Sequence, residues 1–413
     1  MDMENIKANL TYMFPGVGSE YYGMGRALYN RYEKVKKIYH SAKEVVGIDF
    51  YELSFGKNKN KIKENACAQQ ALMCFCYSLF QVFQEEMHLS PDVMMGYSLG
   101  EYSALACAGK MKFKDALYVV NQRAKIIEEV AKDLDGTMVW VINIGWQKVE
   151  NIVAELREGG EKLYVSAYEA NEKVSVSGTN SSMKVLADVI EREQGMVIPV
   201  KMSGPFHSPL MKEAEIKLRE ILKDILFQPG NINVVANYNG EFYRDDRESI
   251  VVNLSGQLSN PILWYPSICQ SRKGFQNIVV ELGPKNVLQY IYKLSFQEDV
   301  CFSVESPKKI MEFKGKIEES SNRYRELVKK CMGLVVSFPN HCESEQIYQE
   351  QIKAEFEKLK HVYTTMEDGW LNHIQMEKEL SRTFGILKAK GVNELEIEKR
   401  LKEITEDTML IGE

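Results

Sequence analysis

The stretch Asp92-Val93-Met94-Met95-Gly96-Tyr97-Ser98-Leu99-Gly100-Glu101 runs from apolar residues into a G-x-S-x-G pattern and then into a helix-like segment. A serine on a sharp strand-to-helix turn is crowded on both sides and needs glycine two positions before and two positions after it. Gly96 and Gly100 supply both. The bare pattern also arises by chance in glycine-containing loops, but the apolar run before it and the helix after it favour a nucleophile turn. We therefore predict an α/β fold with Ser98 as nucleophile.

A serine hydroxyl is a weak nucleophile at neutral pH and needs a general base, usually a histidine. His207 is the strongest candidate because its loop is bounded by glycine and proline and follows a predicted strand, where catalytic side chains tend to be held. The last three histidines fall in a polar region and are expected at the surface. Sequence position alone does not choose among the six, which are His40, His88, His207, His341, His361 and His373.

The segments around the turn alternate apolar runs with amphipathic runs from about Tyr12 to Pro307, as in a parallel sheet with crossover helices. A helix is predicted over 116–134, with one apolar stripe formed by Ala116, Val120, Ile127 and Val130. Strands are predicted over 10–14, 92–96 and 277–282. These segments predict a large α/β subdomain made of residues 1–135 and 203–307.

Two further regions differ from this one in their pattern of strand-like and helix-like runs or in their composition. Residues 136–202 contain four strand-like runs (137–144, 163–168, 174–177 and 195–200) and two helix-like runs (147–158 and 181–194). This β-α-β-β-α-β order predicts an inserted ferredoxin-like subdomain. Residues 308–413 are rich in Glu, Lys and Gln, with breaks near Phe338-Pro339 and at Gly391, and predict a helical C-terminal extension whose role the sequence leaves open.

Composition excludes several classes of function. The 413 residues are 45% hydrophobic and 27% charged with a net charge of −6, which is typical of an ordinary globular protein of two or three structural units. No dense basic cluster suggests nucleic acid as a partner. Residues 1–10 lack the apolar core of a secretory signal, and no apolar run reaches about 18 residues, so we expect no membrane span and a cytoplasmic protein. The eight cysteines form no CxxC pair and are interpreted as reduced core residues, with neither a disulfide framework nor a metal site.

Five ordered segments resemble the malonyl-CoA:acyl carrier protein transacylases and the acyltransferases of polyketide synthases. The resemblance covers about residues 10–305 and leaves the extension outside it. It implies a hydrolase-like large subdomain with an inserted small subdomain. The segments are Phe14-Pro15-Gly16-Val17-Gly18-Ser19, Gly96-Tyr97-Ser98-Leu99-Gly100-Glu101-Tyr102-Ser103-Ala104-Leu105, Gly204-Pro205-Phe206-His207-Ser208-Pro209-Leu210-Met211, Gln257-Leu258-Ser259-Asn260-Pro261 and Glu281-Leu282-Gly283-Pro284.

The resemblance also implies a role for each matching residue. Ser98 would be the nucleophile and His207 its base, with the main chain near Gln257 orienting the imidazole. The N–H groups of Val17 and Leu99 would form the oxyanion hole. Two further residues would contact the acyl group. Arg123 would bind the free carboxylate of a malonyl group, and Gln69 would line the pocket.

Arg123 and Phe206 bear on the choice of acyl group. Arg123 falls on the apolar stripe of its helix, so its guanidinium is expected to be buried and to need a partner, for which a carboxylate is best matched. An internal ion pair with a protein Asp or Glu is the alternative. The resemblance associates Phe206, just before the histidine, with unsubstituted malonyl units, because a bulky ring crowds an α-methyl group.

Three positions depart from the family pattern. Tyr97 replaces the usual histidine before the nucleophile, and Val17 replaces a glutamine while keeping a backbone donor. The stretch Tyr168-Glu169-Ala170-Asn171-Glu172-Lys173 replaces a loop richer in Asn and Gln. The acyl-pocket contacts of the small subdomain are therefore left open.

The sequence as a whole predicts an acyltransferase with no bound cofactor. It would move malonyl from malonyl-CoA, a coenzyme A thioester substrate, to the phosphopantetheine thiol of an acyl carrier protein through a Ser98 ester. A polyketide synthase served in trans is favoured over fatty-acid synthesis. Two alternatives stay open: a hydrolase that clears acyl groups from carrier proteins, and an inactive docking module.

Overall fold

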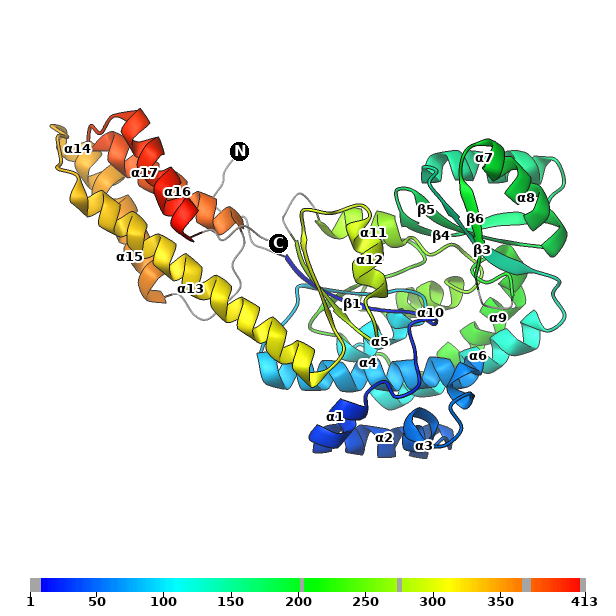
Figure 1. Ribbon diagram of the computed structural model, residues 1–413. Coiled ribbons are helices and arrows are strands. Elements are labelled where there is room, and N and C mark those ends of the chain that lie inside the picture. The colour runs from blue at the N-terminus through cyan, green and yellow to red at the C-terminus, as the bar shows by residue number, and fades with distance from the viewer. Residues whose placement is uncertain (1–8, 201–203, 273–276, 366–372, 409–413) are drawn as a thin grey trace. The chain divides into compact units, whose positions relative to one another are not determined.

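A computed structural model describes residues 9–200, 204–272, 277–365 and 373–408 (Figure 1). Its contacts divide the chain into two compact units, one formed by Asn9–Ile310 and the other containing the chain from Met311 onward. The first unit holds the nucleophile turn. Its central sheet has the strand order β7-β2-β1-β8-β9, and every neighbouring pair is parallel.

The central strands confirm the prediction of a parallel sheet. The three predicted strands match β1 (Asn9–Phe14), β2 (Val93–Gly96) and β8 (Asn277–Leu282) to within one residue at each end. Met13 of β1 pairs with Met95 of β2. β2 and β8 are buried at every position, which is why they appear as unbroken apolar runs. The edge strands β7 (Asn233–Val235) and β9 (Val300–Val304) are short and partly exposed, so their sequence signal is weak.

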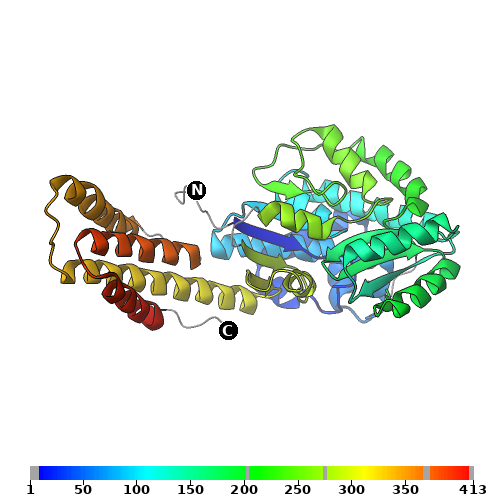
Figure 2. The same cartoon turned by 90° about the horizontal axis from the view of Figure 1, so that it is seen from above.

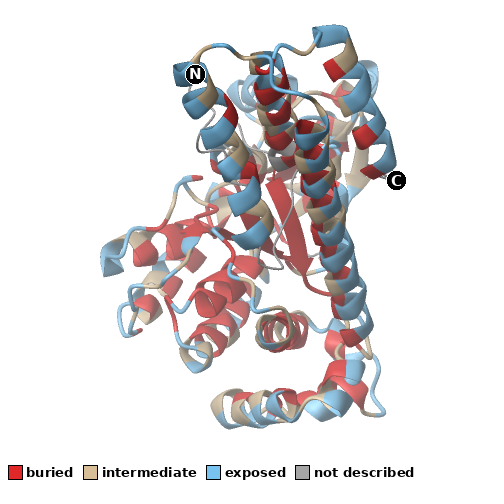
Figure 3. Ribbon diagram, turned by 90° about the vertical axis from the view of Figure 1, so that its left-hand side faces the viewer, coloured by how far each residue is buried: buried red, intermediate tan, exposed pale blue. Residues whose placement is uncertain are grey.

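Helices of the same unit, among them α4 (Asn65–Met87), α5 (Gly100–Cys107) and α12 (Val287–Lys293), pack against this sheet, and Figure 3 colours its central strands red because they are buried. α6 spans Phe113–Ala131, three residues earlier at each end than the predicted 116–134, with Asp115 favouring the new N-terminus. The other described helical segments of the large subdomain are α1 (Arg26–Arg31), α2 (Glu33–Val46), α3 (Phe50–Phe55), η2 (Lys61–Lys63), η3 (Pro209–Met211), α9 (Lys212–Leu222), α10 (Arg247–Gly256) and α11 (Trp264–Arg272).

α4 is the one helix in the described part of the chain that is long and apolar enough to cross a membrane. Its most apolar window is 83% buried inside the protein. Cys74, Phe75 and Leu79 are fully enclosed, and such an all-round apolar helix is typical of a protein core.

The small subdomain has the predicted β-α-β-β-α-β order. Its elements are β3 (Thr137–Ile142), α7 (Trp146–Glu158), β4 (Leu163–Ala170), β5 (Lys173–Gly178), α8 (Asn180–Arg192) and β6 (Met196–Pro199). The strands form a separate antiparallel sheet in the order β4-β5-β3-β6, and the apolar faces of α7 and α8 pack on it. The predicted boundary at 202/203 lies outside the described residues.

The C-terminal unit is helical, as predicted, and buries a core of its own. It comprises α13 (Pro307–Ser337), which begins in the first unit, then α14 (Glu345–Ile347), the π-helical segment η4 (Tyr348–Lys353), α15 (Ala354–Thr365), α16 (His373–Ala389) and α17 (Glu394–Thr408). Figure 2 shows its long helices running side by side. Both predicted breaks are confirmed: α13 ends before Pro339, and Gly391 separates α16 from α17. Lys390 caps α13 by donating to the carbonyls of Val335 (2.7 Å) and Phe338.

Candidate active site

The predicted nucleophile lies on a tight turn between β2 and α5. Ser98 has a left-handed backbone with φ of 52°. A Cβ atom on Gly96 would lie 2.0 Å from the Gly100 carbonyl carbon, and one on Gly100 would lie 2.0 Å from the Phe14 carbonyl oxygen. Both glycines are therefore required by close backbone packing, as the sequence pattern predicts.

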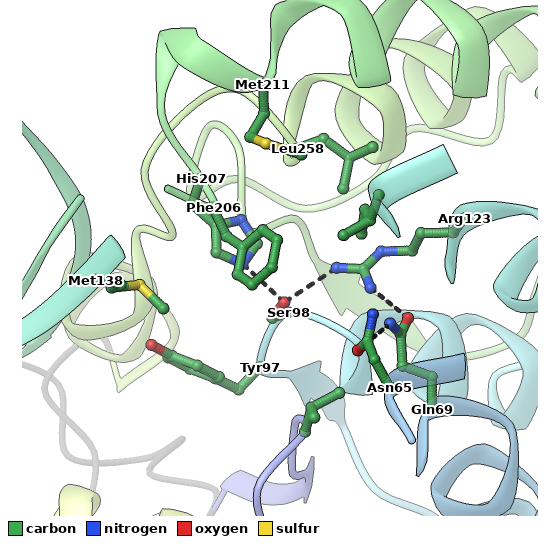
Figure 4. Close-up of a pocket in the computed structure, with 12 residues that line it drawn as sticks. Asn65, Gln69, Tyr97, Ser98, Arg123, Met138, Phe206, His207, Met211 and Leu258 are labelled. Carbon is green, nitrogen blue, oxygen red and sulfur yellow. Dashed lines mark hydrogen bonds between the residues drawn. The ribbon is translucent and has the colours of Figure 1, made fainter. Parts of the chain in front are cut away.

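His207 is the histidine that the fold brings to Ser98. Its Nε2 lies 2.9 Å from the Ser98 Oγ, although 109 residues separate them (Figure 4). The other ring nitrogen, Nδ1, lies 2.8 Å from the Gln257 carbonyl oxygen. Since a carbonyl only accepts, Nδ1 carries the hydrogen and donates to it, which leaves the Nε2 lone pair facing the serine hydroxyl. His207 also has a left-handed backbone, with φ of 55°.

A buried polar network supports this pair from behind. The Gln257 side-chain amide donates to the Ser98 carbonyl at 2.9 Å and to the Glu101 carboxylate. Glu101 also accepts from the Asn237 N–H at 3.0 Å and from the Tyr243 hydroxyl at 2.5 Å. Burial raises the pKa of Glu101 to about 7, although these hydrogen bonds act in the opposite direction. Gln257 is thus fixed by its side chain while its carbonyl orients His207.

Asn237 fixes the turn itself. Its Oδ1 accepts from the Ser98 N–H at 2.7 Å, and its amide donates to the Gly96 carbonyl at 2.7 Å. A left-handed non-glycine residue costs of the order of 1–3 kcal/mol and persists where its surroundings hold it. Asn237 and Tyr243 are absent from the predicted site, and so is Glu101 as a supporting residue. The sequence did contain a signal for Glu101. It is a charged residue within an otherwise uncharged helix that is fully buried, and a buried charge needs polar partners.

The surroundings of His207 keep its imidazole neutral. Burial, opposed by the hydrogen bond to the Gln257 carbonyl and reinforced by the positive charge of Arg123, lowers the pKa of His207 from 6.5 to about 4. A base must be unprotonated to accept the serine proton, and this one is unprotonated at every pH well above 4. The imidazole is therefore able to accept a proton at neutral pH without first losing one.

This electrostatic arrangement predicts the pH dependence of acylation. The kcat/KM for acylation by a coenzyme A thioester should be level from about pH 5.5 to 8 and should fall only as pH drops toward about 4, because His207 gains its proton there. Rapid-mixing acylation rates over this range measure the profile, with circular dichroism confirming that the protein stays folded. An acid limb centred near 6.5 would contradict the prediction.

Arg123 is buried, as its place on the apolar stripe predicts, and lies beside Ser98. Only 4% of its surface is exposed, one terminal nitrogen donates to Gln69 Oε1 at 2.6 Å, and the other lies 3.3 Å from the Ser98 Oγ. Its Nε has no hydrogen-bond partner. Within the described residues no carboxylate lies at ion-pair distance from Arg123, and the buried Glu101 attracts its charge only from further away.

These groups line one small pocket of about 60 Å³, equivalent to about four water-sized volumes. Of the predicted site residues, Leu99 and Gln257 are not part of the lining: Leu99 is buried at the start of α5, and Gln257 lies behind His207. A pocket of this size suits an acyl group of a few carbon atoms. Its lining residues are Val17, Asn65, Gln69, Tyr97, Ser98, Arg123, Ile127, Met138, Phe206, His207, Met211 and Leu258.

The described part of the chain holds no candidate metal site and no disulfide bond. No group of three or more His, Cys, Asp or Glu side chains is placed there to hold a metal ion. All eight cysteines are free thiols, and six of them are buried.

A serine on a strained strand-to-helix turn, with an imidazole against its hydroxyl, is the arrangement found in serine enzymes that form acyl intermediates. Comparison with known families agrees. Residues 11–319 match the acyl transferase domain, so the chain belongs to the acyl transferase domain family. This match covers the whole pocket.

Individual relatives resemble the chain over the same region. A malonyl CoA-acyl carrier protein transacylase of Bacillus subtilis strain 168 is 28% identical over 305 residues, which are 73% of this chain and 95% of the relative. One of Staphylococcus aureus strain MRSA252 is 28% identical over 285 residues, 68% of this chain and 90% of the relative. Among solved structures, MCAT from Streptococcus pneumoniae has a TM-score of 0.69 at 29% identity, covering 74% of this chain and 99% of that one. A malonyl-transacylase in complex with a type II PKS acyl-carrier protein has a TM-score of 0.70 at 26% identity, covering 74% and 98%.

Proposed function

We propose that this protein transfers a malonyl group from malonyl-CoA to the phosphopantetheine thiol of an acyl carrier protein, through an ester on Ser98. The observation that carries the proposal is the buried Arg123, which lies 3.3 Å from the Ser98 Oγ and lacks a carboxylate partner among the described residues. A malonyl thioester brings both a carbonyl for Ser98 and a carboxylate for Arg123. The names of the relatives support the same substrate and acceptor.

The first half-reaction forms the ester. The Ser98 oxygen attacks the thioester carbonyl while His207 Nε2 takes the hydroxyl proton. The N–H groups of Val17 and Leu99 would hold the oxyanion, since the Ser98 N–H already donates to Asn237. The carbon–sulfur bond then breaks, and the thiolate of coenzyme A leaves with the proton from His207.

The second half-reaction reverses these steps with a different thiol. The phosphopantetheine thiol of the carrier protein gives its proton to His207 and attacks the Ser98 ester. The ester bond breaks, the serine oxygen regains the proton, and a malonyl thioester leaves on the carrier. Coenzyme A thioester and carrier protein are thus the two substrates, and no bound cofactor takes part.

Phe206 supports a preference for malonyl over methylmalonyl. Its ring lines the pocket beside His207 and is 9% exposed, so an α-methyl group would have to displace a packed ring (Figure 4). One methyl group is worth about 1–3 kcal/mol of discrimination. We expect a preference of this size.

We also propose that the enzyme serves a polyketide synthase in trans, with fatty-acid synthesis as the alternative. A solved relative that binds a type II PKS acyl-carrier protein supports this role. The cytoplasm is the proposed compartment, because the eight free thiols suit a reducing environment.

Replacing Arg123 tests the proposed substrate. In Arg123→Gln, acylation by malonyl-CoA should fall about 10- to 150-fold, the equivalent of the 1.5–3 kcal/mol of a hydrogen bond to a charged group. Acylation by acetyl-CoA should fall far less, because acetyl has no carboxylate. Rates of label incorporation from the two donors measure this difference.

Two controls sharpen this experiment. Arg272→Gln removes an arginine that is ion-paired with Asp299 outside the pocket, and should leave the malonyl-to-acetyl ratio unchanged. Adding holo carrier protein to the malonylated enzyme should move the label to the carrier. Equal losses for malonyl and acetyl would contradict the role of Arg123, and release of free malonate in place of transfer would favour the hydrolase.

A further inference from the structure

Two of the positions that depart from the family pattern meet in the structure. The Tyr97 hydroxyl donates to Glu169 Oε1 at 2.8 Å. Tyr97 precedes the nucleophile, whereas Glu169 lies on β4 of the small subdomain, 72 residues later. Burial and the neighbouring Glu169 raise the pKa of Tyr97, which keeps the phenol protonated as the donor.

The Glu169 carboxylate has hydrogen-bond or ion-pair partners for both of its oxygens. Only 3% of its surface is exposed, and Ser175 (2.8 Å) and Trp140 (3.2 Å) also donate to it. Lys173 forms an ion pair with its other oxygen and lies 4.4 Å from the centre of the Trp140 ring. A buried carboxylate that left these partners would lose several kcal/mol of compensation. Glu169 is therefore a rigid anchor for the Tyr97 hydroxyl.

The ring of Tyr97 is also held from the large subdomain. Trp264, which is fully buried, packs edge-to-face against it with ring centres 5.6 Å apart and an interplanar angle of 78°. With its hydroxyl anchored and its ring packed, Tyr97 has no free rotation beside Ser98.

The location of this fixed ring matters for substrate choice. In Figure 4, Arg123 and Gln69 lie on one side of Ser98, and Tyr97 and Met138 lie on the other. An uncharged acyl chain gains nothing beside the guanidinium, because it would leave buried N–H donors without an acceptor. One direction open to it is the side of Met138, and the Tyr97 ring lines the pocket there.

Building on the proposed function, we infer that Tyr97 is a specificity-determining residue that excludes uncharged acyl chains longer than acetyl. Glu169 is a positioning residue that acts through Tyr97 by holding its hydroxyl while Trp264 packs against its ring. Selection for malonyl then has two parts: Arg123 attracts the carboxylate, and the anchored ring rejects alkyl chains that cannot use it.

A competition experiment tests this inference. Full-length protein is mixed with equal amounts of malonyl-CoA and butyryl-CoA, and intact-protein mass spectrometry reads the ratio of the two acyl masses on the enzyme. Tyr97→Ala should raise the butyryl-to-malonyl ratio at least about tenfold, and Glu169→Ala should raise it about threefold or more. Glu169→Gln keeps an acceptor for the hydroxyl and should stay near the wild-type ratio. Because a ratio does not depend on the folded fraction, loss of stability does not mimic the effect.

Two further variants separate the anchor from general packing. In the Tyr97→Ala background, Glu169→Ala should change the ratio less than twofold, since Glu169 acts through the ring. Tyr168→Phe removes another tyrosine–glutamate hydrogen bond of the small subdomain, 2.8 Å to Glu150, and should leave the ratio unchanged. A wild type that takes malonyl, together with a Tyr97→Ala variant whose ratio stays within twofold of it, would overturn this inference alone. A wild type that takes no malonyl would overturn the proposed function.

Discussion

Ser98→Ala should take up no acyl group at all. The Ser98 oxygen is the atom that would form the ester, and His207 has no hydroxyl to activate once that oxygen is removed. Incubation with radiolabelled malonyl-CoA, followed by acid precipitation, measures the covalent label. The wild type should retain close to one malonyl group per chain, whereas the variant should stay at background.

A matched serine provides the control. Ser78 is buried in α4, where its hydroxyl donates to the Cys74 carbonyl at 2.7 Å, and it lies outside the pocket lining. Ser78→Ala should therefore label like the wild type. Equal labelling of Ser98→Ala and wild type would show that the acyl group attaches elsewhere and would end the proposed mechanism.

His207→Ala should slow acylation by about 10²–10⁴-fold, the usual contribution of a positioned general base. The loss should be nearly constant across neutral pH, because the imidazole is unprotonated throughout that range. Single-turnover rates of malonylation, measured by quenched flow, give this factor directly.

His40 offers a contrasting histidine. Its side chain is 78% exposed on α2, near Glu44, and His40→Ala should leave the acylation rate unchanged. If the two histidine variants lose rate equally, the assignment of His207 as the base is wrong. The comparison also separates His207 from one of the other five histidines that sequence position leaves open.

The features of the site that depend on local sequence could be predicted from the residues themselves, whereas the contacts of His207 with Ser98 and Gln257 were expected only through the family resemblance. The turn at Ser98 was predictable because its two glycines stand at fixed positions in a five-residue pattern, although the backbone that crowds Gly100 belongs to the distant Phe14. The burial of Arg123 followed from helical periodicity alone. The small subdomain was predictable because its strands and helices alternate in one continuous segment.

Asn237 shows where sequence reasoning ends. It contacts the Ser98 N–H from 139 residues away, in a loop without a chemical motif. Only the parallel alignment of β7 beside β2 brings it to the turn. The anchoring of Tyr97 by Glu169 is of the same kind, since each residue was an isolated departure from a pattern until the fold placed them in contact.

The positive φ angles of Ser98 and His207 carry a cost for the whole enzyme. Glycine would adopt either backbone geometry without strain and would remove about 1 kcal/mol or more of strain from the folded protein at each position, a gain that its larger loss of chain entropy on folding partly offsets. A laboratory evolution campaign that rewarded heat tolerance alone would thus drift toward glycine at the two places where turnover forbids it. Thermal stability and catalysis therefore place opposite demands on these two residues. Any effort to stabilise this enzyme has to keep both positions under selection for activity.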